Sequence, residues 1–159
     1  MKKTHKLYDV RKITDLRDMV RQSANIYGDL DAFLVRDGIS GKQRNISFRQ
    51  FQNDISYLGS ALCDLGLKGG MIAIISENRY EWCLSYLAVV NGTGTVVPLD
   101  RELPESELHS LLERSDSCAV LCSGDYVDVL REKQASLPNL RKIICFDLEK
   151  SERDVLSFN

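Results

Sequence analysis

Hydrophobic and polar positions follow two rhythms along the chain, and their succession predicts short strands separated by amphipathic helices. In some segments apolar residues recur every three to four positions, which is the spacing of one buried helix face. Shorter runs, several of them almost wholly apolar, have the length and composition of strands. The expected helices cover residues 15–27, 47–65, 79–91, 105–114 and 125–134, and the expected strands cover residues 32–36, 44–48, 71–75, 95–99, 118–122 and 142–146.

Capping and turn residues mark where these elements begin and end. Thr14 and Ser47 precede the first two helices and predict N-caps, because a hydroxyl can accept a hydrogen bond from a free backbone N–H of the first turn. Gly66 and Gly92 predict helix ends, since glycine accepts the left-handed terminal conformation. The first two strands are expected to pair as a hairpin through the turn residues Asp37, Gly38 and Gly41.

The order of elements predicts an α/β fold. Residues 71–75 are apolar without alternation, which suits a strand covered on both faces. Strands alternating with helices at short loop lengths favour a mostly parallel sheet flanked by helices, with the small β-hairpin near the N-terminus. Residues 149–159 are charged and weakly patterned, so we expect them to be a linker or a frayed end that follows a folded unit at 1–148.

Composition fits a globular protein and excludes several classes of partner. Of 159 residues, 43% are hydrophobic and 28% are charged, which argues against disorder. The net charge of -2 gives no global basic field for nucleic acid or an anionic membrane. No apolar stretch is long enough to span a bilayer and no signal-peptide pattern opens the chain, so we expect a cytoplasmic protein. An odd set of cysteines indicates reduced, buried thiols: Cys63, Cys83, Cys118, Cys122 and Cys145.

Glycine-rich segments do not match phosphate-binding loops. Gly41-Lys42 is followed by Gln43, whereas a P-loop needs a hydroxyl residue there and an earlier glycine. Residues 92–94, Gly-Thr-Gly, begin like a dinucleotide fingerprint, but Val97 stands where the third glycine belongs. They also precede a strand instead of following one. A helix terminator and turn is the better interpretation.

Metal-binding and nucleophilic patterns are weak. Cys118 and Cys122 are expected on the same side of one strand, yet a structural zinc site needs a second pair of ligands. His5 and His109 have no ligand-like spacing, and His109 is expected on a solvated helix face. We therefore expect both cysteines to be small buried hydrophobes. No serine or cysteine lies in a nucleophile elbow.

The most unusual string is Asn-Arg-Tyr-Glu-Trp at residues 78–82, which follows a strand and opens a helix. Ligands of parallel sheets gather at the carboxyl ends of strands, where free N–H groups favour anions. The structural interpretation is favoured: Asn78 caps the helix, Glu81 three residues later completes a capping box, and Trp82 fills the core.

Taken together, four strings in order resemble the adenylate-forming enzyme superfamily, and within it the AMP-forming acyl-CoA synthetases. The resemblance covers roughly residues 16–147 and is closest to long-chain fatty acid–CoA ligases. Gly70 stands where the family usually has Asp, and Gln50-Phe51 replaces Glu-Leu. The strings are Ile-Ser-Phe-Arg-Gln-Phe (46–51), Gly-Leu-Lys-Gly-Gly-Met-Ile-Ala-Ile (66–74), Asn-Arg-Tyr-Glu-Trp (78–82) and Gly-Thr-Gly-Thr-Val-Val-Pro-Leu-Asp (92–100).

The resemblance implies an N-terminal fragment of a larger ligase that joins a fatty acid to CoA through an acyl-adenylate. Such a ligase uses ATP, Mg and CoA, and positioned donors with a metal neutralise the phosphate charges. The family's phosphate loop, nucleotide-binding motifs and C-terminal catalytic lysine have no counterpart in residues 1–159. We therefore assign no catalytic, cofactor-binding or metal residue. We expect an inactive scaffold whose partner is the remainder of the ligase, with an exposed apolar face that favours self-association.

Three alternatives stay open from the residues. A standalone interaction or regulatory domain, such as a receiver-like module, would need clustered acidic residues at strand ends, whereas Asp100 and Asp147 are expected to stand alone. A naturally short paralogue could bind acyl groups without activating them. The chain could also belong to another branch of the superfamily, such as peptide-synthetase or luciferase-like adenylation domains.

Overall fold

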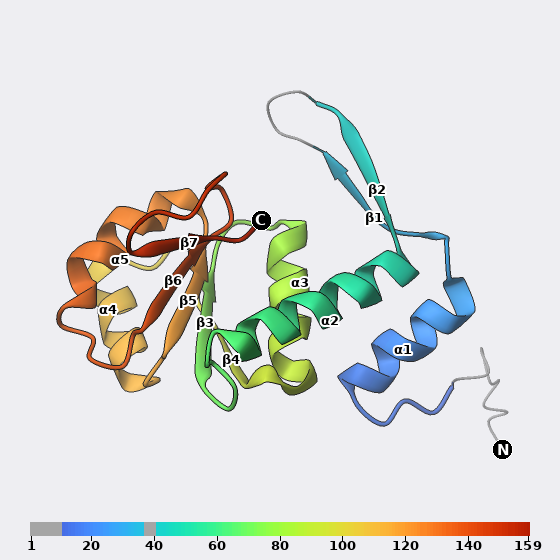
Figure 1. Cartoon of the computed structure of the whole chain (residues 1–159), viewed down its shortest axis with the longest axis horizontal. Helices are drawn as coiled ribbons and strands as arrows, with labels where there is room; N and C mark the ends of the chain where they lie inside the picture. Colours follow the sequence, from blue (N-terminus) through green and yellow to red (C-terminus); the bar gives the residue numbers. More distant parts are fainter. Residues whose placement is uncertain (1–10, 37–40) are drawn as a thin grey trace, which may run out of the picture.

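A five-stranded parallel sheet lies at the centre of the computed structural model, which describes residues 11–36 and 41–159. The strands run in the order β4-β3-β5-β6-β7, and every neighbouring pair is parallel. The sheet therefore confirms the α/β class that the alternating pattern predicts (Figure 1). Its strands are β3 (Met71–Ile75), β4 (Thr95–Pro98), β5 (Ala119–Cys122), β6 (Lys142–Cys145) and β7 (Val155–Ser157).

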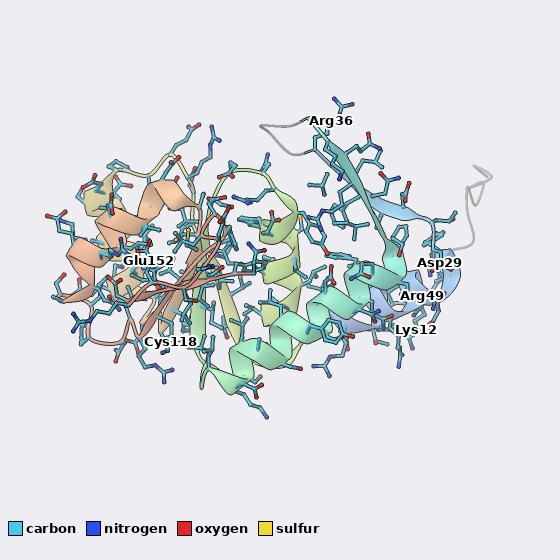
Figure 2. The ribbon with its side chains drawn as sticks, turned by 45° about the horizontal axis from the view of Figure 1, so that its top comes forward. Lys12, Asp29, Arg36, Arg49, Cys118 and Glu152 are labelled. Atoms are coloured by element: carbon cyan, nitrogen blue, oxygen red, sulfur yellow. The ribbon has the colours of Figure 1, made fainter. Side chains whose placement is uncertain are left out.

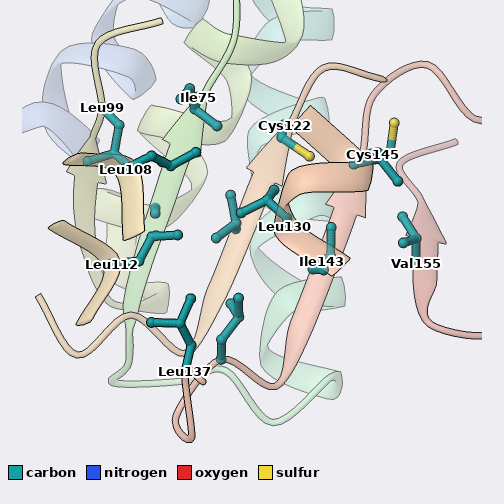
Figure 3. Close-up of a cluster of buried hydrophobic side chains, with 14 residues drawn as sticks. Ile75, Leu99, Leu108, Leu112, Cys122, Leu130, Leu137, Ile143, Cys145 and Val155 are labelled. Atoms are coloured by element: carbon teal, nitrogen blue, oxygen red, sulfur yellow. The ribbon is translucent and has the colours of Figure 1, made fainter. Parts of the chain in front are cut away.

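Helices cover both faces of this sheet and enclose two apolar cores. On one face, α4 (Glu105–Arg114) and α5 (Val127–Gln134) bury leucines against the strands (Figure 3). On the other, α2 (Phe48–Asp64) and the helix α3 (Tyr80–Ala88) with its continuation enclose the second core. A 3₁₀ turn, η2 (Gly124–Tyr126), leads into α5.

Strand β3 shows why the central strands are uniformly apolar. Ile72 and Ile74 face the second core, while Ala73 and Ile75 face the first, and all four are fully buried. Successive side chains point to opposite faces of a strand, so a strand covered on both sides has no place for a polar residue. The prediction for residues 71–75 is confirmed.

A third apolar cluster joins the N-terminal elements to α3. The antiparallel hairpin of β1 (Asp31–Arg36) and β2 (Gln43–Ser47) stands beside the body, and α1 (Leu16–Tyr27) packs on α2 (Figure 1). Phe33 of the hairpin lies 4.7 Å from Phe51 and 5.2 Å from Tyr80, measured between ring centroids. The predicted hairpin is confirmed, although the turn residues Asp37 and Gly38 lie outside the described residues.

The ends of α2 agree with the prediction, whereas the start of α1 differs. The Ser47 hydroxyl accepts from the Gln50 N–H at 3.1 Å, and Gly66, with φ of 75°, ends the helix. The N-cap of α1 is Asp15 and not Thr14, because the Asp15 carboxylate accepts from the Asp18 N–H at 2.7 Å. The backbone N–H of Thr14 instead donates to the Asp18 carboxylate.

The expectation of a linker over residues 149–159 is wrong for β7. Val155 is fully buried and pairs with Ile143, which adds a fifth strand. A loop shields this edge: the Ser157 N–H donates to Ser151 Oγ at 2.9 Å, and the Glu152 N–H donates to the Val155 carbonyl at 2.8 Å. The division of the chain at residue 148 stays a prediction.

Truncating Leu62 tests how the second core depends on α2. Leu62 is 1% exposed, so Leu62→Ala should lower the free energy of unfolding by about 2–5 kcal/mol through lost burial and a cavity. Leu65→Ala, at the C-cap residue of the same helix and at 36% exposure, should cost less than about 1 kcal/mol. Urea denaturation followed by circular dichroism measures both. Equal losses would contradict the proposed packing.

Candidate functional site

Polar side chains gather at the carboxyl ends of β3, β5 and β6, the edge where parallel sheets usually hold ligands. A cavity of about 840 Å³ lies between this edge and the hairpin β1–β2. Glu77 follows β3, Ser123 follows β5, and Asp147 follows β6. Arg79, at the N-terminus of α3, lies among them. This edge is therefore the candidate site.

The guanidinium of Arg79 binds three carboxylates at once. Its Nε donates to Glu81 Oε2 at 2.8 Å. Its Nη1 donates to Glu77 Oε1 at 3.0 Å and to Asp147 Oδ1 at 2.7 Å. The cation also lies 5.2 Å from the centre of the Phe146 ring, which adds a cation–π contact. We call Glu77, Arg79, Glu81 and Asp147 the Arg79 cluster.

Neighbouring groups engage the second oxygens of these carboxylates. Ser123 Oγ donates to Glu77 Oε2, and the Gly124 N–H donates to Asp147 Oδ2, each at 2.7 Å. From β2, Arg44 Nη2 lies 3.9 Å from Glu81 Oε1. The cluster thus joins three strand ends, the start of α3 and the hairpin, although Asp147 and Arg79 are 68 positions apart in the sequence.

The pKa shifts indicate that Glu77, Arg79 and Asp147 stay charged near neutral pH. Partial burial raises the pKa of Glu77, but hydrogen bonds, led by that from Ser123, and the Arg79 charge outweigh it, so the net pKa is lowered. Burial likewise opposes the bonds from Arg79 and Gly124 at Asp147, whose pKa is also lowered. For Arg79, burial lowers the pKa, but its hydrogen bonds to Glu81 and Asp147 outweigh burial, so the net pKa is raised.

The string at residues 78–82 therefore differs from its predicted cap. Asn78 is exposed, and the N-cap residue of α3 is Arg79, which makes no capping bond with its side chain. Glu81 accepts a hydrogen bond from Arg79 instead of forming a capping box with Asn78. Trp82 packs against the second core and stacks on Tyr86 at 5.4 Å between centroids, which confirms its packing role.

The pattern of strand ends predicted that Asp147 would stand alone, and the structure differs. Its carboxylate accepts from both Arg79 and Gly124, so it is committed to an ion pair. A receiver-like module requires free acidic groups at this edge, and none of the contacts of Asp147 favours that alternative.

The surroundings of Arg79 itself do not favour a nucleotide polyphosphate. Three carboxylates bind its guanidinium, so its donors are already engaged, while the other cations of the cavity, Arg36, Lys42 and Arg44, belong to the hairpin side. The Gly124 N–H, which could bind an anion, is already bonded to Asp147. Within residues 11–36 and 41–159, no group of three or more His, Cys, Asp and Glu side chains is arranged to hold a metal ion. The interactions of this site therefore join the start of α3 to the ends of the strands, and we call this its anchoring role.

Residues 92–94 form a turn, as predicted. Gly92 has φ of 133°, and the Thr93 hydroxyl donates to the Ala88 carbonyl at 3.0 Å, inside a single π turn, η1 (Val89–Thr93). A Cβ at Gly94 would collide with the carbonyl oxygen of Gly70. Gly41-Lys42 leads directly into β2, so it opens a strand and not a phosphate-binding helix.

Cys118 and Cys122 lie on opposite faces of the sheet, in contrast to the prediction that they share one side. Cys118 packs in the second core and Cys122 in the first, beside Cys145 (Figure 3). All three are buried free thiols, and burial raises the pKa of Cys122, which confirms the role of small hydrophobes. Cys63 and Cys83 are only half-buried.

The histidines add no chemistry to this edge. His109 is half-buried, and its Nε2 lies 2.9 Å from Ser136 Oγ, on the side of the molecule formed by α4. The prediction for His5 falls outside the described part of the chain.

Comparison with known proteins identifies similar sequences over most of the chain. The family model described as "AMP-binding enzyme" matches residues 20–158. Fatty acyl-CoA synthetase A of Dictyostelium discoideum is 34% identical over 148 residues, which are 91% of this chain and 20% of that protein. Fatty acyl-CoA synthetase B of the same organism is 28% identical over 141 residues, covering 86% of this chain and 21% of that protein. The chain thus spans about a fifth of the length of these relatives.

Solved structures share the fold. The coronafacic acid ligase of Pectobacterium brasiliense aligns with a TM-score of 0.74 at 23% identity, over 91% of this chain and 28% of that chain. A putative long-chain-fatty-acid CoA ligase of Rhodopseudomonas palustris aligns with a TM-score of 0.75 at 24% identity, over 88% and 34%. None of the helices in the described residues combines the length and apolar character needed to cross a membrane.

Removing the cation should destabilise the fold more than removing an exposed one. Arg79→Met leaves three carboxylates facing one another, so we expect a loss of about 1–3 kcal/mol in the free energy of unfolding, below that of a fully buried pair. Arg49→Met breaks an exposed pair with Asp29 and should cost at most about 1 kcal/mol. Chemical denaturation at neutral pH compares the two. A smaller loss for Arg79→Met would contradict the anchoring role.

The same cluster should make stability sensitive to acid. The pKa values of Glu77 and Asp147 lie below their ordinary 4.5 and 3.8, so their contribution is complete above about pH 5 and is lost as the pH falls through the lowered values. Free energies of unfolding measured from pH 7 to pH 3 should therefore fall less steeply for Glu77→Gln/Asp147→Asn than for the parent. Parallel curves would rule out this source of acid sensitivity.

Proposed function

Because the chain belongs to the AMP-binding enzyme family, we propose that it forms structural framework in an AMP-forming acid–CoA ligase. The proposed overall reaction converts a fatty acid, ATP and CoA to acyl-CoA, AMP and pyrophosphate. The proposed place of this segment is the N-terminal portion of that enzyme, where its sheet would support the rest of the large domain. It supplies no group that acts on the reacting atoms.

The closed Arg79 cluster is the observation that carries this proposal. Acyl-adenylate formation gathers several negative charges, which positioned donors and a metal must neutralise. Here the guanidinium of Arg79 is bound to three carboxylates, and the nearby Gly124 N–H is bonded to Asp147. These residues are therefore assigned no part in the reaction that involves ATP and Mg. Charge handling is proposed to belong to the part of the family's polypeptide, about four fifths in the relatives, that lies outside the matched region.

The proposed substrate class is a fatty acid. It is supported by the names of the relatives that match most of the chain, the two fatty acyl-CoA synthetases of Dictyostelium discoideum. Long-chain-fatty-acid–CoA ligase 5 of Mus musculus, 31% identical over 108 residues, points to the same class. ATP, Mg and CoA are proposed as reactants and cofactor of the whole ligase, and cytoplasmic location stays a prediction.

A chimera tests the framework role. The segment of Dictyostelium discoideum fatty acyl-CoA synthetase A that matches this chain would be replaced by it, and fatty acid-dependent ATP–pyrophosphate exchange would be measured. We expect the chimera to retain exchange, because the packing and anchoring positions are supplied. The purified chain alone should show none with any fatty acid tested, because Arg79 is committed to three carboxylates and the described residues include no cluster that could hold a metal ion.

A matched variant separates support from chemistry. The chimera carrying Arg79→Met should lose thermal stability while its exchange rate, measured below its melting temperature, stays close to that of the chimera. A loss of exchange in a fully folded variant would place Arg79 in the reaction. Exchange by the chain alone would refute the framework role outright.

A further inference from the structure

Another cavity lies at the opposite end of α3 from the Arg79 cluster. It has a volume of about 560 Å³ and is enclosed by α1, α2 and η1, so we call it the α1–η1 cavity. α3 begins at the carboxyl edge of the sheet and leads into η1, and this run of helix separates the two ends by roughly 20 Å. The volume lies within the range of roughly 300–1,000 Å³ that is usual for small-molecule sites.

Two cations of α1 line this cavity. Arg17 and Arg21 are four positions apart, so they project from one face of the helix. In the described part of the chain, the Arg17 guanidinium has no carboxylate partner and donates to the Asn91 carbonyl. Arg21 donates to a single carboxylate, that of Asp18, at 2.8 Å. A guanidinium has five N–H donors, so both side chains keep donors for a further acceptor.

Hydroxyl groups of α2 form the wall that faces these cations. Ser56 and Ser60 are one turn apart, and each hydroxyl donates to the carbonyl four residues earlier, which leaves its oxygen able to accept. Among the described residues that line the cavity, the charged ones are Arg17, Arg21 and Asp64, two cations against one anion. The lining therefore favours a polar ligand with negative charge.

Asn91 carries a polar atom that the described residues do not satisfy. Its side chain lines the cavity, and its Oδ1 is buried and accepts no hydrogen bond from them. A buried polar atom without a partner costs stability, and most such atoms have one. Exchanging the oxygen and nitrogen of the amide would leave a buried donor in the same position, so either orientation needs a polar partner. A hydroxyl group suits both orientations, because it donates and accepts.

We propose that the α1–η1 cavity binds a hydroxylated phosphomonoester of the size of a sugar phosphate. The phosphate oxygens accept from Arg17 and Arg21, a sugar hydroxyl donates to Asn91 Oδ1, and further hydroxyls contact Ser56 and Ser60. Planar guanidinium groups suit phosphate oxygens because their N–H donors can bind them in pairs. A phosphomonoester carries a charge of about -1.5 to -2 near neutral pH, which matches two cations better than the single charge of a carboxylate.

The cations of the hairpin belong to the other cavity. Arg36 lines the cavity beside the Arg79 cluster, and Figure 2 shows it remote from Lys12, which directly precedes α1, and from Arg49 at the start of α2. A ligand held by Arg17 and Arg21 is therefore distinct from one held at the carboxyl edge of the sheet. Separate substitutions can test the two sites.

Isothermal titration calorimetry of the whole chain with glucose 6-phosphate and with ribose 5-phosphate tests this assignment. Glucose and inorganic phosphate are the partial ligands, because one lacks the anion and the other lacks the sugar hydroxyls. We expect saturable binding of at least one sugar phosphate. It should be about tenfold tighter than binding of either partial ligand, since each of these forgoes one set of hydrogen bonds.

Alkylation locates the bound molecule. Cys63 lines the α1–η1 cavity, whereas Cys83, which is also half-buried, packs against the third apolar cluster. A saturating sugar phosphate should cover Cys63 and slow its reaction with iodoacetamide, while the reaction of Cys83 stays unchanged. Peptide mass spectrometry measures both rates. An unchanged rate at Cys63 would place the ligand elsewhere and overturn the assignment.

A charge pair tests the anion contacts. Arg17→Met/Arg21→Met should weaken binding at least about tenfold, because two charged donors are lost. Arg101→Met/Arg114→Met removes the same charge at exposed positions outside the cavity and should leave binding nearly unchanged.

An amide substitution separates binding from folding. Asn91→Leu should weaken binding about fivefold, while the melting temperature of the unliganded chain does not fall, because a buried atom without a partner is removed. Asn53→Leu, at an exposed position of α2 outside the cavity, is the matched control and should bind like the parent. A purely structural role for the Asn91 amide would instead lower the melting temperature without changing the affinity of the folded chain.

Three further results would overturn the proposal. The first is that neither sugar phosphate binds saturably. The second is that inorganic phosphate binds as tightly as the sugar phosphates, which would leave no part for the hydroxyl contacts. The third is that the two arginine pairs weaken binding equally, which would indicate a diffuse charge effect.

Discussion

Neutralising one partly buried guanidinium is the constraint on which the arrangement of the molecule depends. A cation withdrawn from water needs charged and hydrogen-bonding partners, and Arg79 takes them from after β3, from α3 and from after β6. These contacts fix the start of α3 against the sheet. Tyr80, the next residue, then donates to Asp54 of α2 at 2.6 Å and packs on Phe33 of the hairpin. The sheet, the helix layer and the hairpin are thus positioned from one point.

The same contacts explain why this sheet edge differs from the usual binding edge of a parallel sheet. A carboxylate that accepts from Arg79 has less capacity to hold a metal ion, and the Gly124 N–H that orients Asp147 is lost to an anion. Rigidity and ligand binding compete for the same donors and acceptors. In this chain the competition is resolved in favour of rigidity, which is the property that a supporting segment of a larger enzyme requires.

Local pattern predicted the elements, and long-range pairing escaped it. Residues 71–75 were predictable because burial on both faces leaves only apolar choices. The cap of α1 was misplaced by one residue, since Thr14 and Asp15 are both good capping residues. β7 was missed because its three residues follow a charged stretch and give too short a pattern. The opposite faces of Cys118 and Cys122 follow from a strand that begins only at Ala119.

The candidate site was missed for a related reason. Asp147 and Arg79 are far apart in the sequence, so no spacing rule connects them. A signal existed in the topology: both follow strands of one parallel sheet, and the carboxyl ends of such strands meet at one edge. Ion pairs at partly buried positions, as at Arg79, hold the fold together, whereas an exposed pair, as between Arg49 and Asp29, contributes little to stability. Where charges lie in the fold, more than their sum, decides which of these roles they serve.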